Sequence, residues 1–322
     1  MTLLLDVILP VFLLIGAGFA AARFGALTPA AVDGIMTFAQ NFALPVLLFR
    51  AISTLDLSAA YNLGLMASFY IGAACAFAIV FAAAHWGFGR SLPESVAAGF
   101  AGYFSNTLLL GVPITERAFG TDALQGNFAI LSVHAPLLYT CGIIAMVLAK
   151  SRASARQGAR ALAASALRGI VTQPLVIGIL CGFALNISGQ TLPIFAQSAA
   201  DMLARAAIPA ALFGLGGVLL RYRPEGELHL IALVCTASLI LHPAITFALA
   251  NWVFELDTPA LRSATLTAAM APGVNAYLFA HMFAVGRKTA ASAVLLGTAG
   301  ALITVWVWLQ ILPEPHPRQS PF

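Results

Sequence analysis

The chain contains very little charge. Lys and Arg contribute 16 of its 322 residues and Asp and Glu contribute 12, which together make 9%. Globular domains carry about 25% charged residues. Hydrophobic residues make up 61% of this sequence and its mean hydropathy is +0.93. So few charges cannot cover a water-facing surface, which excludes a soluble enzyme, a nucleic-acid-binding protein and a disordered scaffold.

Catalytic and metal-binding motifs are also missing. The sequence has no Walker A loop, no His-Glu-x-x-His, no paired aspartates and no Gly-x-Ser-x-Gly, the signatures of the ATPases, zinc proteases and hydrolases that would be considered. Its cysteines lie in apolar segments without metal-ligand spacing, and we interpret them as packing residues. We therefore expect no enzyme, no catalytic residues, no metal and no cofactor. The four cysteines are Cys75, Cys141, Cys181 and Cys235.

Long apolar runs dominate the chain. A helix that crosses a bilayer needs about 20 apolar residues, whereas a membrane barrel would show alternating segments of about ten. The sequence therefore predicts an all-α polytopic membrane protein with ten transmembrane helices. We expect the first run to be a permanent span, since no basic region precedes it. The predicted spans are 3–22, 31–50, 62–85, 94–116, 123–149, 169–187, 198–220, 228–254, 260–284 and 289–312.

Basic residues are distributed unevenly between the two sets of loops. Loops after odd-numbered spans hold 11 Lys and Arg residues, and the opposite side holds 4. Because cytoplasmic loops are enriched in these residues, the odd-numbered loops are predicted to be cytoplasmic and both termini to lie on the other side. The basic segment 150–168 is then a cytoplasmic linker, either extended along the membrane or a short surface helix.

The two halves of the chain repeat each other. Prolines recur with a shift of 164 residues and a Trp, Pro and Gly set recurs with a shift of 166. We therefore divide the chain into a first five-helix repeat, 1–149, and a second, 169–322. Because five is odd, the second repeat enters the membrane from the opposite side, as in many secondary transporters. The matching pairs are Pro10/Pro174, Pro29/Pro193, Pro45/Pro209, Trp86/Trp252, Pro93/Pro259 and Gly120/Gly286.

The fourth and ninth spans carry the residues that break helices. Pro removes a backbone donor, and unpaired backbone groups are costly in lipid unless they line a cavity or bind a ligand. Two half-helix N-termini at one place favour an anion, and the Asn106 and Asn275 amides would donate to a carboxylate. The alternative is a simple proline kink satisfied by nearby hydroxyls. Substrate-binding candidates are Tyr103, Ser105, Asn106, Gly111, Pro113, Pro272, Gly273, Asn275 and Tyr277, the two tyrosines being equally compatible with packing.

Three histidines lie inside the predicted spans: His134, His242 and His281. Ionisable groups at such depth are functional candidates, and histidine titrates near neutral pH, so we consider them as ion-coupling residues. A neutral histidine bonded to a freed carbonyl is the alternative. Asp201 and Arg205 are four residues apart, a spacing that predicts an ion pair along one helix.

Four segments resemble the auxin efflux carrier family, in its bacterial branch related to the plant PIN-formed carriers. The resemblance implies a scaffold of spans 1, 2, 6 and 7 and a transport domain of spans 3–5 and 8–10 with crossed helices 4 and 9. It also implies a homodimer through the scaffold and, for a bacterial member, the cytoplasmic (inner) membrane. The segments are Asn41-Phe-Ala-Leu-Pro45-Val-Leu-Leu-Phe49, Ser105-Asn106 through Gly111-Val-Pro113, Ile208-Pro209 through Leu215-Gly216, and Pro272 through Asn275.

Together these features predict a secondary active transporter that exports or exchanges a small organic anion, a carboxylate, by elevator-type alternating access. Its partners are the lipid bilayer, the anion and a coupling proton or sodium ion, with no nucleic acid. The alternative is a passive anion channel built on the same helix breaks. No motif selects the substrate, the coupling ion or the direction of transport.

Overall fold

The computed structural model describes residues 3–151, 169 and 172–313. Within these residues the chain is helical and contains no strand, as expected. The basic linker predicted at 150–168 lies outside the described residues from position 152 onward. Seven described helices are long and apolar enough to cross a membrane, which supports an integral, multi-pass protein. They are Leu4–Arg23, Pro29–Ser53, Leu63–Gly87, Leu124–Lys150, Ile194–Leu219, Leu228–Val253 and Arg287–Ile311.

Several of these long helices are built from shorter α-helical segments joined by single π-helical turns. The first half comprises α1 (Leu9–Arg23), α2 (Pro29–Phe38), α3 (Leu44–Ser53), α4 (Leu57–Ala60), α5 (Leu63–Ala82), α6 (Leu92–Tyr103), α7 (Val112–Phe119) and α8 (Leu124–Ser151). The second comprises α10 (Pro174–Ser188), α11 (Ile194–Leu219), α12 (Leu228–Thr236), α13 (His242–Ala248), α14 (Thr258–Ala268), α15 (Val274–Phe283) and α16 (Arg287–Ile311).

Prolines accompany four of the six π-helical turns in the described residues. The π-helical turns Leu3–Ile8, Ala39–Ala43, Thr107–Gly111 and Ala237–Leu241 each end just before an α-helix whose second residue is proline. Proline has no N–H and its ring collides with the carbonyl four residues earlier. The preceding turn therefore widens and the helix continues beyond it.

The three other predicted spans are not single long helices. Span 169–187 corresponds to α10, which has 15 residues. Span 94–116 is divided into α6 and a second helix formed by the π-turn Thr107–Gly111 and α7. Span 260–284 is divided into α14 and α15. The two spans in which the sequence predicts breaks are therefore the two that are interrupted.

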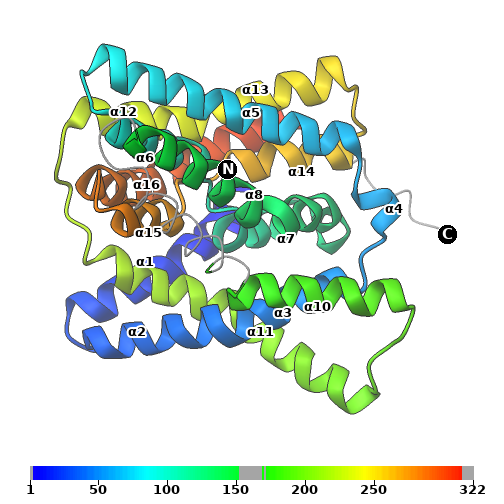
Figure 1. The fold of residues 1–322 in the computed structure, drawn as a ribbon. Helices are drawn as coiled ribbons and strands as arrows, with labels where there is room; N and C mark the ends of the chain where they lie inside the picture. The colour runs from blue at the N-terminus through cyan, green and yellow to red at the C-terminus, as the bar shows by residue number, and fades with distance from the viewer. Residues whose placement is uncertain (1–2, 152–168, 170–171, 314–322) are drawn as a thin grey trace.

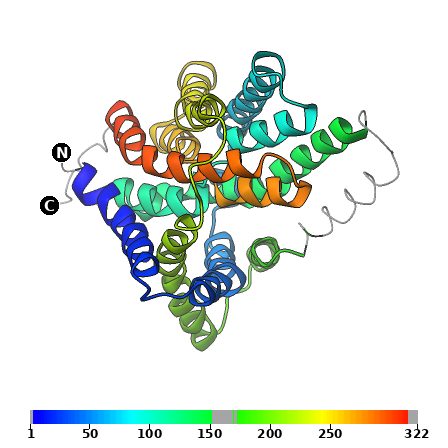
Figure 2. The same cartoon turned by 90° about the vertical axis from the view of Figure 1, so that its left-hand side faces the viewer.

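The helices form two groups. Helices α1, α2, α3, α10 and α11 lie together on one side of the molecule, and α5–α8 and α12–α16 form the other side (Figures 1 and 2). Glycines bring α1 and α11 very close. A Cβ on Gly18 would lie 1.9 Å from the Phe213 carbonyl oxygen, and one on Gly216 would lie 2.0 Å from that of Ile15. The broken helices belong to the second group.

Candidate functional site

The two helix breaks pair with each other. The Asn106 N–H donates to the Ala271 carbonyl at 2.8 Å, and the Gly273 N–H donates to the Phe104 carbonyl at 2.8 Å. These bonds form an isolated antiparallel bridge between the two breaks. Each break releases backbone groups from its helix, and buried backbone groups require partners. At the crossing, backbone N–H and carbonyl groups released by one break therefore form hydrogen bonds with those released by the other.

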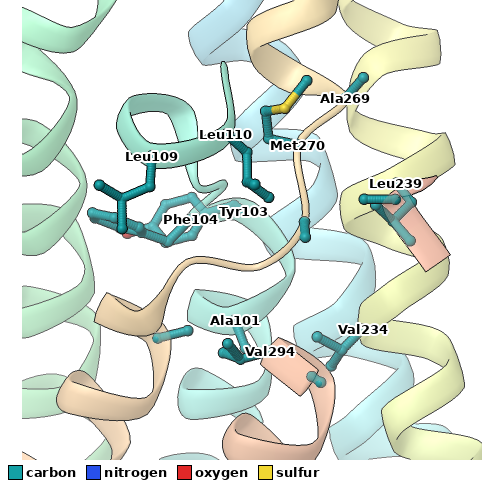
Figure 3. Close-up of a cluster of buried hydrophobic side chains, with 14 of the residues drawn as sticks. Ala101, Tyr103, Phe104, Leu109, Leu110, Val234, Leu239, Ala269, Met270 and Val294 are labelled. Carbon is teal, nitrogen blue, oxygen red and sulfur yellow. The ribbon is translucent and has the colours of Figure 1, made fainter. Parts of the chain in front are cut away.

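Apolar packing supports the crossing from behind. Figure 3 shows the extended segment between α14 and α15, with Met270 on it lying beside Leu110 from the other break. Both side chains are fully buried. A Cβ on Gly111 would lie 3.5 Å from the Met270 Cγ, so Gly111 packs against this segment. On the other side, a Cβ on Gly297 would lie 2.6 Å from the Pro272 Cδ, so α16 has room for the Pro272 ring only because it carries glycine there.

Both second half-helices begin at the crossing. The Asn106 carbonyl accepts from the N–H groups of Leu110 at 3.1 Å and Gly111 at 3.3 Å, which starts the helix leading into α7. The Gly273 carbonyl accepts from the Ala276 N–H at 2.9 Å at the start of α15. The N-terminal end of a helix carries a partial positive charge and free N–H groups. The two half-helices therefore place two such ends at the same crossing.

A cavity of about 210 Å³, hereafter the crossing cavity, adjoins this point. It is lined by residues of both breaks together with residues from α3, α8 and α10 and the turn before α3. None of its lining residues is Asp, Glu, Lys or Arg, as far as the described chain extends. Its polar lining residues are Gln40, Asn41, Ser105, Asn106, Thr107, His134, Gln173 and Asn275.

Two polar groups at the first break have no hydrogen-bond partner among the residues that the structure describes. Asn106 is 8% exposed and its Nδ2 atom is buried without a hydrogen bond, as is the Ser105 hydroxyl. Asn275 is half-buried, and its carbonyl accepts from the Tyr139 hydroxyl at 3.2 Å. A buried donor without a partner costs about 1–3 kcal/mol, so such groups in a cavity wall are available to bind a ligand or a water molecule.

The remaining substrate-binding candidates are not among the described residues that line the crossing cavity. Pro272 forms the bridge with Ser105. The Tyr103 hydroxyl donates to the Leu138 carbonyl, and its ring packs against aromatic neighbours. The Tyr277 ring packs 4.9 Å from that of Tyr222. Pro113 lines a separate, larger cavity of about 760 Å³.

The three candidate histidines occupy different environments. His134 lines the crossing cavity, is 3% exposed, and interacts with the Ser105 backbone; by hydrogen-bond geometry, neither ring nitrogen has a partner in the described part of the chain. His242 is fully buried and its Nε2 lies 3.2 Å from the Phe69 carbonyl oxygen. His281 is exposed and lies beside Tyr277, with ring centroids 5.9 Å apart. Only His134 of these three adjoins the cavity.

The larger cavity contains charges that the sequence did not relate to one another. Asp201 pairs with Arg50, with 2.6 Å between the carboxylate and the Nε atom. Arg205 donates instead to the backbone carbonyl of Asp201 at 3.2 Å. The predicted ion pair between Asp201 and Arg205 is therefore wrong, because the carboxylate turns toward a neighbouring helix. Arg50 is 151 residues away in sequence, so no local spacing indicates this partner.

Comparison with known proteins gives the family. A model described as membrane transport protein matches residues 3–309. One relative, the "Putative malonate transporter" of Rhizobium meliloti (strain 1021), is 25% identical over 303 residues, 92% of each chain. Another, the "Lysosomal cholesterol signaling protein" of Mus musculus, is 25% identical over 335 residues, covering 97% of this chain and 38% of the relative. Because the family model covers nearly the whole chain, the protein belongs to the membrane transport protein family, which is the auxin efflux carrier family that its motifs resemble.

Proposed function

We propose that this protein is a secondary active transporter of a small carboxylate that works by elevator-type alternating access. The observation that carries the proposal is the pair of helix breaks joined at Ser105 and Pro272, beside a largely apolar cavity whose described lining has several polar but no charged side chains. Secondary transporters bind substrates on interrupted helices near the membrane midplane. Membership of a transporter family supports a transported small molecule.

The cavity wall suits an anion. The unpartnered Asn106 amide and Ser105 hydroxyl are donors, and Asn275 lies at the start of α15. Helix N-termini attract carboxylates and phosphates without a buried cation. No lining carboxylate opposes an anion in the described residues. We propose that Ser105, Asn106, Gly273 and Asn275 contact the substrate. Gly111, Pro113, Pro272, Tyr103 and Tyr277 hold or shape the crossing. The Rhizobium relative is named for malonate, which we take as the first substrate to test.

The arrangement of cavities supports alternating access. One buried apolar cluster borders both cavities, so the cluster lies between them. Its residues Leu48, Leu131 and Ile179 line the crossing cavity, and its residue Leu124 lines the larger cavity. Both cavities lie between the two helix groups. We propose that α1–α3, α10 and α11 are the scaffold and that the second group is the transport domain. Sliding of one group past the other would close one cavity and open the route through the other.

The ion pairs of the described residues are consistent with the proposed orientation. Arg221 pairs with Asp33, Arg90 with Glu227 and Lys288 with Glu225, and all six lie in or beside loops assigned to the cytoplasm. The Arg50–Asp201 pair lies on the opposite side. We propose two inverted repeats, 1–149 and 169–322, joined by the cytoplasmic linker 150–168. Both termini would lie outside the bacterial inner membrane. The resemblance adds a homodimer through the scaffold.

The test is substrate counterflow in proteoliposomes loaded with unlabelled malonate. A carrier exchanges internal for external substrate, so labelled malonate accumulates transiently, and Asn106→Ala with Asn275→Ala should abolish the overshoot. A passive anion channel, the alternative, shows flux down the gradient without an overshoot. Saturable malonate binding without counterflow would contradict the carrier mechanism. If malonate neither binds nor crosses the membrane, malonate is not the substrate.

A further inference from the structure

His134 lies at the wall of the crossing cavity on α8. By hydrogen-bond geometry neither buried ring nitrogen has a partner within the described residues, and the ring interacts with the Ser105 backbone at the first helix break. The cavity that His134 lines also contains the amides of Asn106 and Asn275. A buried imidazole that has no side-chain partner among the described residues therefore lies in the same cavity as the proposed carboxylate site.

Among the described residues, the surroundings of His134 contain no compensating charge. The Phe69 ring on α5 lies 5.6 Å from it and the Phe104 ring after α6 lies 4.7 Å away. The titratable groups around it are neutral and already hydrogen-bonded. They are Tyr70 to the Ile130 carbonyl, Tyr139 on α8 to the Asn275 carbonyl, Tyr103 on α6 to the Leu138 carbonyl, and His242 on α13 to the Phe69 carbonyl.

In this cavity an isolated imidazolium is poorly stabilised, and dipoles alone hold an anion. An imidazolium without a counter-ion is costly in apolar surroundings, and a desolvated carboxylate meets only dipoles there, since no basic residue lines the described cavity. Opposite charges a few ångströms apart stabilise each other strongly in such an environment. Binding of the anion and protonation of the ring would therefore promote one another.

We infer that His134 takes up one proton when the carboxylate binds, so that the anion and the proton are carried together. The inference rests on the proposed anion site and names its coupling partner as a proton rather than a sodium ion. Protonation adds one N–H donor to His134, and no other bond forms or breaks. His242 does not share this role, because it already contacts the Phe69 carbonyl and does not line the cavity.

The experiment is isothermal titration of the purified protein with malonate at pH 7.5, in buffers of different ionisation enthalpy. At this pH both malonate carboxylates are ionised. We expect the dependence of heat on buffer to give close to one proton taken up per malonate. We also expect the affinity to rise up to about tenfold for each unit fall in pH, as linkage requires for uptake of one proton.

Variants of His134 test whether this residue takes up the proton. His134→Gln keeps polar atoms but cannot ionise, and it should bind malonate more weakly, with proton uptake near zero and little pH dependence. The exposed His281 is the matched control, and His281→Gln should keep the wild-type proton count. His134→Asn serves the same purpose if His134→Gln does not fold.

The outcomes are distinct. Malonate binding to the wild-type protein without proton uptake would overturn the inference and leave the anion site standing. Undiminished uptake in the His134 variants would place the proton on malonate or another residue and would also overturn it. If malonate does not bind at all, the proposed carboxylate site fails, and the inference fails with it.

Discussion

Arg50 and Asp201 form an ion pair that joins α3 to α11, with 2.6 Å between the Arg50 Nε and the Asp201 Oδ1. Their side chains are 17% and 38% exposed, so the pair is partly withdrawn from solvent. Both residues line the larger cavity. The pair therefore joins two helices of the proposed scaffold beside the larger cavity.

Breaking this pair should lower the stability of the protein. Exposed pairs contribute less than about 1 kcal/mol and removal of one partner of a buried pair costs about 3–5 kcal/mol, so we expect about 1–3 kcal/mol for Arg50→Ala. Arg205→Ala removes only a bond to a backbone carbonyl and is the matched control. Thermal unfolding in detergent measures both. Equal melting temperatures for the two variants would contradict a structural role for the pair.

The contact between α1 and α11 should tolerate no side chain at its glycines. Gly18→Ala places a Cβ against the Phe213 carbonyl oxygen and Gly216→Ala places one against that of Ile15, both at 2.0 Å or less. Since these neighbours are backbone atoms, the helices must separate, at a cost of at least about 1–3 kcal/mol for an overpacked core. Yield and melting temperature should both fall. Gly16→Ala is the control, because no atom lies within 4 Å of its Cβ position, and a similar loss there would refute the packing argument.

Much of the fold could be predicted from the sequence because it depends on local features. Long apolar runs predict membrane helices directly, and the predicted limits agree with the seven long helices within a few residues. Pro272 and Gly273 indicated where a helix must end. The break at Asn106 lies in the fourth span, which the sequence predicts to be broken, but Pro113 itself continues a helix after a widened turn.

The tertiary relationships could not be predicted in the same way. The bridge between Ser105 and Pro272 joins residues 167 positions apart, a separation that no local pattern encodes. His134, His242 and His281 are equivalent in sequence terms, and only their packing shows which one adjoins the cavity. Gln173 also lines the cavity, but a lone glutamine at the start of a helix gave no signal of its own.

Cysteine labelling tests the proposed orientation. Ser188 and Arg223 are both exposed and lie beyond opposite ends of α11. In a chain without its native cysteines, we expect a membrane-impermeant maleimide to label Ser188→Cys from outside and Arg223→Cys only after the membrane is opened. Labelling of both from one side would exclude a membrane-spanning α11. The reverse pattern would invert the assigned orientation.

Charge placed at the two asparagines tests the anion site most directly. Asn→Ala at Asn106 or Asn275 removes an amide donor to the substrate. Loss of such a buried hydrogen bond should weaken the binding free energy of malonate by about 1–3 kcal/mol. Asn→Asp keeps the shape but sets a negative charge against the substrate in a cavity shielded from water, where repulsion is strong. Both Asp variants should therefore bind malonate more weakly than the matching Ala variants.

This order should depend on pH, because protonation of the introduced carboxyl removes the repulsion. The ratio of Asp to Ala affinities at each position should approach one as the pH falls. Asn186 is the control, since its amide donates to the carbonyls of Ile52, Ser53 and Leu55 away from the cavity. Asn186→Ala and Asn186→Asp should lower the melting temperature with no charge-ordered change in affinity. If the breaks are only proline kinks, Asn106 and Asn275 should behave as Asn186 does. Equal malonate affinities for their Asp and Ala variants at neutral pH would then remove both from the binding site.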